Sequence, residues 1–155
     1  MSTIVIGMHE LVRLRQRFEK VEDLLTKDDE LASRIGQQQV ESARYRILDT
    51  KVDPKGVRWQ AWSERYRKAG RKKNTSLMVR TGAMADSMDY NVINPGAVEV
   101  GSPLPYFGAH LYGVPSRNLP QRAALDTEPG FADSSDRREI REILRDIWNR
   151  EVKKR

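Results

Sequence analysis

One stretch of the chain combines strand-forming residues with a turn signal, and it restricts the choice of fold more than any other. Residues 92–93 and 98–100 are rich in valine and isoleucine, and the Asn-Pro-Gly sequence at 94–96 between them is typical of a tight turn. Long polar sequences with helical spacing lie on both sides. The pattern predicts an α+β fold with two N-terminal helices, a small central antiparallel sheet and a C-terminal helix. We expect three or four short strands in the sheet.

Apolar residues recur at alternating steps of three and four over residues 8–27, which is typical of an amphipathic helix. They are Leu11, Leu14, Phe18, Val21 and Leu25. A second helix is predicted over residues 28–50, where apolar positions are sparser and Gly36 weakens the centre. The short link between the two helices indicates a helical hairpin over residues 1–50.

The rest of the chain divides at proline, glycine and serine signals. Residues 51–76 are predicted to be a loop with a basic segment, and residues 77–130 a β unit that ends in a short strand at 123–125. A C-terminal helix is predicted over residues 134–153, because capping serines precede a stripe of isoleucine and leucine. We expect residues 1–155 to form a single domain in which Trp59 and Trp148 are substantially buried.

The composition favours some partners over others. The 155 residues carry a formal net charge of +6, which favours anionic partners. The absence of cysteine excludes disulfides and thiolate metal sites, and it is compatible with a reducing compartment. No apolar run approaches the ~18 residues of a membrane span, and the N-terminus does not resemble a signal peptide. We therefore expect a soluble, unsecreted protein without a membrane partner.

Residue patterns for catalysis are weak. The two histidines, His9 and His110, do not fall in a metal-ligand spacing, and no glycine cluster matches a phosphate loop. His110 lies among aromatic residues, where a packing or interface role is favoured over that of a general base. The sequence predicts no catalytic residue, no cofactor and no metal site, and an enzyme is not expected.

The segment from residue 65 to 73 carries six positive side chains and no acidic one, and it is predicted to be a mobile loop. They are Arg65, Arg67, Lys68, Arg71, Lys72 and Lys73. With Trp62 and Tyr66 nearby, this segment could follow a nucleic-acid backbone while an aromatic side chain stacks on a base. The favoured alternative is a solvated loop, or one that orders against an acidic protein, since no nucleic-acid-binding motif accompanies the charge.

Three blocks together resemble the phage virion morphogenesis (tail completion) family of Mu-like and P2-like tailed phages. The first is DPKGVRWQAW at 53–62, similar to a proline-glycine-x-x-tryptophan start, and the second is LMVRTGAMADSM at 77–88. The third runs from VEVGS at 98–102 through YFGAHLYG at 106–113 to LPQR at 119–122. The chain departs from the family pattern at Met84 and Met88, which replace leucine and isoleucine, and at 123–126, where AALD replaces an aromatic, leucine and glycine.

This resemblance implies a structural protein of the tail or neck of a virion, made in the cytoplasm of a bacterial host. It implies tail completion, tail termination or head–tail joining by a non-catalytic ring, with six copies expected. Its partners would be other copies of itself and the adjacent neck, connector or tail tube proteins, with possible contact to DNA in the channel. The competing function is nucleic-acid binding through residues 65–73.

Under this interpretation, aromatic and basic side chains around the β unit form the contacts with other subunits or partners. They are Arg80, Tyr106, His110, Tyr112, Arg117 and Arg122. We expect residues 117–122 to form an exposed loop whose arginines meet acidic groups at 133–142 of a neighbour.

Overall fold

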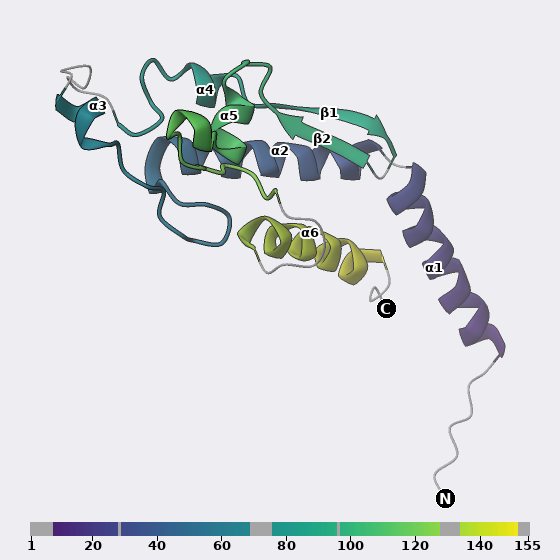
Figure 1. Ribbon diagram of the computed structural model, residues 1–155. Coiled ribbons are helices and arrows are strands. Elements are labelled where there is room, and N and C mark those ends of the chain that lie inside the picture. Colours follow the sequence, from purple (N-terminus) through teal and green to yellow (C-terminus); the bar gives the residue numbers. More distant parts are fainter. Residues whose placement is uncertain (1–7, 28, 69–75, 96, 128–133, 152–155) are drawn as a thin grey trace, which may run out of the picture.

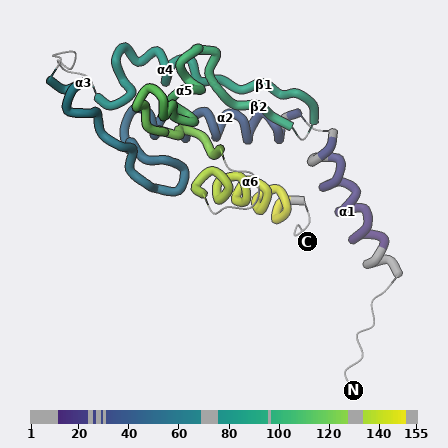
Figure 2. Tube along the Cα trace, viewed as in Figure 1, coloured from purple at the N-terminus to yellow at the C-terminus, as the bar shows by residue number. Residues whose placement is uncertain are grey.

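Figure 1 shows the computed structural model of the chain, which describes residues 8–27, 29–68, 76–95, 97–127 and 134–151. Helix α2 (Asp29–Tyr45) runs through the middle and continues as a π-helical turn, Arg46–Thr50. A β-hairpin packs along one side of α2, and α6 (Ser135–Glu151) packs along the other. The Cα trace in Figure 2 shows the same three layers. The predicted α+β fold is confirmed.

The hairpin consists of β1 (Asp89–Asn94) and β2 (Ala97–Gly101), paired antiparallel with Val92 opposite Val98. The expectation of three or four strands was wrong, because the described residues form one sheet of two strands. The short strand expected at residues 123–125 is also absent from the described structure. Two of its residues, Ala123 and Ala124, instead lie buried in the core at 7% and 1% exposure.

Gly36 fixes how closely the hairpin approaches α2. A Cβ atom at this position would lie 2.5 Å from Cδ2 of Tyr90 and 2.8 Å from Cγ2 of Val98. Neither distance is compatible with van der Waals contact, so only glycine lets both strands reach the helix backbone. The residue that seemed to weaken the second helix therefore allows the hairpin to pack on it.

The main core lies between α2, the hairpin and the segments that follow each of them. Its buried members are Val40, Ala43, Ile47, Trp59, Met84, Ala85, Met88, Phe107, Leu111, Ala123 and Ala124. Trp59 is 8% exposed, and its Nε1 donates a hydrogen bond to the Ala123 carbonyl oxygen at 3.2 Å. The predicted burial of Trp59 is confirmed, because the ring fills the core while its one polar atom is satisfied.

Helix α1 (Met8–Lys27) packs against α6 and leans away from α2 in Figure 1. The rings of Phe18 and Trp148 meet with centroids 5.5 Å apart. The expected helical hairpin does not form, because the β-hairpin and α6 already cover α2. Trp148 is 37% exposed, so its predicted burial was wrong: it lies on the face of α6 that meets α1 rather than in the core.

The remaining helices are short. They are α3 (Glu64–Lys68), α4 (Ala83–Asp86), α5 (Phe107–Tyr112) and a 3-10 turn, Pro115–Arg117. The mobile loop predicted for residues 65–73 was wrong at its start, which is helical. Glu64 and Lys68 form an ion pair one turn apart at 3.7 Å, and Ser63 Oγ accepts a hydrogen bond from the Tyr66 amide. Residues 69–73 lie outside the described part of the chain.

Candidate assembly surface

An open hollow of about 450 Å³ lies beside α5, between the start of α3, the segment at 76–84 and Arg122. Its walls include the aromatic side chains of Trp62, Tyr66 and Tyr106. Trp62 and Tyr66 are themselves in contact, with ring centroids 5.7 Å apart. The hollow is therefore bounded by flat aromatic rings beside polar and charged side chains, a mixture that suits contact with another molecule.

Arg122 lines the hollow, and it is held there by backbone contacts. Its amide donates to the His110 carbonyl oxygen at 2.7 Å, and its Nε donates to the Gln60 carbonyl oxygen at 3.1 Å. Gly113 lets the chain pass close to Gln121, the residue before Arg122. A Cβ at position 113 would lie 2.8 Å from the Gln121 nitrogen, and the φ of 75° also favours glycine.

The position of Arg122 corrects one expectation. The sequence predicts an exposed loop over residues 117–122, but Arg122 is only 4% exposed. Burial lowers the pKa of its guanidinium group below the usual value. Within the described chain, no carboxylate forms an ion pair with it. Arg122 is therefore a buried cation on the wall of an open hollow.

His110 and Tyr106 stand beside Arg122. Their rings meet edge to face, with centroids 6.5 Å apart at 88°. Burial lowers the pKa of His110 from its usual 6.5, and the neighbouring charge of Arg122 lowers it further. The Nδ1 atom of His110 is buried and has no hydrogen-bond partner among the described residues. Burial and the charge of Arg122 therefore both disfavour the protonated form of His110.

The segment before α4 forms the rim. Ser76 and Val79 are joined by a tight turn, and Met78 adopts a left-handed conformation with φ of 64°. Arg80 follows and is exposed. Thr81 Oγ1 accepts a hydrogen bond from the Ala83 amide at 3.4 Å, just before α4.

The structure brings together four of the six side chains predicted from the sequence for this surface. Arg80, Tyr106, His110 and Arg122 all line the hollow. Tyr112, at 68% exposure on α5, and Arg117, exposed on the 3-10 turn, do not line it.

The predicted basic segment is described only at its start. Arg65, Arg67 and Lys68 are exposed on α3. Arg71, Lys72 and Lys73 lie outside the described residues.

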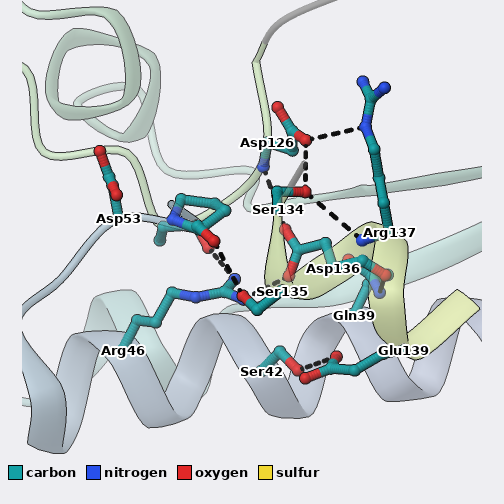
Figure 3. A network of polar contacts seen from close by, with 12 residues as sticks. Gln39, Ser42, Arg46, Asp53, Asp126, Ser134, Ser135, Asp136, Arg137 and Glu139 are labelled. Carbon is teal, nitrogen blue, oxygen red and sulfur yellow. Dashed lines mark hydrogen bonds and ion pairs between the residues drawn. The ribbon is translucent and has the colours of Figure 1, made fainter. Parts of the chain in front are cut away.

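A second polar cluster, shown in Figure 3, joins α2 to the start of α6. Arg46 is 5% exposed and forms an ion pair with Asp136, which is 2% exposed. Arg46 also donates to the Ala124 carbonyl oxygen at 2.8 Å and to Ser135 Oγ at 2.7 Å. Burial raises the pKa of the Asp136 carboxyl group, against the effect of the hydrogen bond from Arg46.

This cluster corrects a second expectation for two residues, Asp136 and Glu139, while residue 133 lies outside the described part of the chain. Acidic groups at 133–142 were expected to meet arginines of a neighbouring subunit. Asp136 instead pairs with Arg46, and Glu139 accepts a hydrogen bond from Ser42 Oγ at 2.6 Å. No local sequence signal distinguishes Arg46 from the exposed arginines around it, because its partner lies 90 residues away.

In the described ranges, no group of three or more histidine, aspartate or glutamate side chains is arranged to hold a metal ion. The helices in those ranges include none that is long and apolar enough to cross a membrane.

Together, the fold and the hollow define a small α+β protein that presents an aromatic, cationic surface. Residues 9–148 match the model of the phage virion morphogenesis family, so the chain belongs to that family and is a structural, virion-associated phage protein. No curated protein and no solved structure matches the chain. The resemblance seen in the three sequence blocks is confirmed.

Proposed function

We propose that this protein completes the phage tail by forming a closed ring at the neck or tail end, with six copies as the expected number. The observation that carries the proposal is the family match, which covers residues 9–148. The proposed role includes tail termination and head–tail joining, both of which require a ring around the DNA channel. It is structural, and we propose no catalytic step.

Exposed apolar side chains in two places support assembly into a ring. On α1, Leu14 and Phe18 lie one turn apart on the same face and are 42% and 47% exposed. On α5, Tyr112 is 68% exposed. The two helices lie toward different ends of α2 in Figure 1. A closed ring is built from head-to-tail contacts between two different surfaces, which this arrangement provides.

The test is the assembled particle. The proposal expects density for the chain as a closed ring at the neck or tail end. Tyr112→Asp should fold normally, since its ring is largely in solvent, yet give heads and tails that do not join. Tyr45→Asp is the matched control, because Tyr45 is 59% exposed on α2, outside both surfaces. A particle without this chain, or with isolated copies that lack neighbour contacts, would refute the proposal.

A second candidate is nucleic-acid binding through residues 65–73. The observation in its favour is that Arg65, Arg67 and Lys68 are all exposed on α3. Binding driven by phosphate contacts should collapse steeply as salt rises, whereas a ring with an apolar interface should persist. Sedimentation of the protein, with and without a DNA duplex, over a series of salt concentrations separates the two.

A further inference from the structure

The hollow beside α5 contains a buried positive charge without a negative one. Arg122 is 4% exposed, and its side chain donates a hydrogen bond from Nε to the Gln60 carbonyl oxygen. The rim adds a second cation, the exposed Arg80. None of the described residues that line the hollow is acidic.

A buried guanidinium group is costly unless an anion compensates its charge. In the Arg46 cluster of the same protein, a carboxylate supplies that compensation. At Arg122 the side chain borders an open hollow instead, so a group from outside can reach it. A planar carboxylate matches the fork of guanidinium donors, and such bonds strengthen where water is excluded.

We propose that this hollow is a docking site for an aspartate or glutamate side chain carried by another protein of the particle. Arg122 would bind the carboxylate, Arg80 would close over it from the rim, and Trp62, Tyr66 and Tyr106 would contact the apolar residues that flank it. The proposal rests on the proposed function in one respect: the partner is taken to be another protein of the phage particle.

The charge of the chain argues for a different protein rather than a second copy. A copy of this chain carries a net charge of +6, and the exposed acids of its last helix lie next to arginines, as Glu142 does beside Arg141. Docking such a segment would bring further positive charge to a hollow that already holds two arginines. An acidic partner brings the opposite charge and is favoured.

The burial of Arg122 argues for a side chain rather than a DNA backbone. A DNA backbone presents a row of phosphates, and proteins neutralise it with several cations at once. Arg122 is a single buried cation among aromatic side chains, where one carboxylate on a flexible side chain can reach it. The exposed cations of α3 suit phosphate far better.

The first experiment uses the purified full chain and a blocked tripeptide, acetyl-Leu-Glu-Leu-amide. The side-chain N–H signals of Arg122 and the ring signals of His110 are followed by NMR during the titration. Both should shift with this peptide and stay in place with the matched acetyl-Leu-Gln-Leu-amide. Equal shifts with the two peptides, or none with either, would overturn the proposal.

Variants of the two arginines test whether peptide binding depends on their positive charge. Arg122→Gln should weaken binding of the glutamate peptide by about tenfold or more, because a charge-assisted hydrogen bond is lost. Since Arg122 is buried, circular dichroism must show that this variant folds. Arg80→Gln should also weaken binding of the glutamate peptide. Because Arg80 is exposed, this variant tests the role of positive charge without disturbing the core. Arg34→Gln, exposed on α2, is the matched control and should leave affinity unchanged.

The second experiment identifies the occupant in the particle. A photo-crosslinking benzoylphenylalanine at position 106 should attach to an aspartate- or glutamate-containing segment of another particle protein. Crosslinks to DNA, or to a second copy of this chain, would overturn the proposal. If the chain is missing from particles altogether, the proposed function fails, while the peptide titration still decides whether the hollow binds a carboxylate.

Discussion

Replacing Asp136 by alanine tests whether the polar cluster between α2 and α6 holds the fold together. Arg46, at 5% exposure, would keep its bonds to the Ala124 carbonyl and Ser135 Oγ but lose its only paired negative charge in the described chain. The Asp126 amide would also lose its acceptor, Asp136 Oδ2, at 3.2 Å. Removing one partner of a buried ion pair costs about 3–5 kcal/mol. Since small domains are stable by ~5–15 kcal/mol, the loss should be large.

The measurement is equilibrium unfolding in urea, followed by circular dichroism at neutral pH. Asp146→Ala is the matched control, because Asp146 is exposed on the same helix, and its cost should stay within about 0.5 kcal/mol. A double variant, Arg46→Met with Asp136→Leu, removes both charges. It should recover much of the lost stability, since apolar replacement of a buried pair is often neutral.

Two results would refute this reasoning. Asp136→Ala could unfold at the same urea concentration as Asp146→Ala, which would mean that Arg46 does not depend on its carboxylate. Alternatively, the double variant could be as unstable as Asp136→Ala alone. Removal of the unpaired charge would then bring no net gain, contrary to the reasoning above.

Three further predictions concern the core and the hollow. Gly36→Ala should cost about 1–3 kcal/mol in urea unfolding, because its Cβ would overlap the hairpin, whereas Gly101→Ala, which meets nothing within 4 Å, should cost clearly less. The pKa of His110 is lowered in the folded state, so its contribution to stability is present above pH 6.5 and is lost as pH falls through the folded value. His110→Gln should flatten the stability profile in that window, and parallel profiles for variant and parent would contradict this. Trp59→Ala should cost about 3–5 kcal/mol, while Trp148→Ala, at a position 37% exposed, should cost less; equal losses in the unfolding midpoint would be evidence against this difference.

Local patterns in the sequence predicted the elements of this fold well. The 3.6-residue period placed α1 at Met8–Lys27, and the valine and turn signals placed the β1–β2 hairpin. Each pattern reflects contacts within one segment, so it is visible in a short window. For the same reason, it did not show that α1 packs on α6 rather than α2.

Contacts between distant residues escaped prediction. Gly36 resembled a weak point of a helix, and only the position of Tyr90 shows that it permits close packing. Ala123 and Ala124 were expected to form a strand, but they bury their small side chains in the core without pairing. Backbone pairing and burial leave the same apolar signal in so short a run.

The candidate site was predicted in part. The aromatic segment around Tyr106 and His110 stood out because it combines large rings with glycine, and the predicted Arg80 and Arg122 line the same hollow. The burial of Arg122 was not foreseen, since a proline-bounded loop normally lies at the surface. The burial of Arg122 depends on the hydrogen bond from its amide to the His110 carbonyl oxygen. These two residues are not related by a helical or strand repeat, so the sequence pattern does not reveal the contact.

The pairing of Arg46 with Asp136 also has a consequence for the order of events during synthesis. Arg46 leaves the ribosome 90 residues before its partner, which at ~5–20 residues per second is a delay of roughly 5 to 20 s. Throughout that interval the nascent chain carries a guanidinium group that cannot be buried without cost. The charge of Arg46 is therefore compensated only when the start of α6 has emerged. A chain cut short before Asp136 would keep every residue of the main core but leave Arg46 without its carboxylate, so it should be less stable than the full chain.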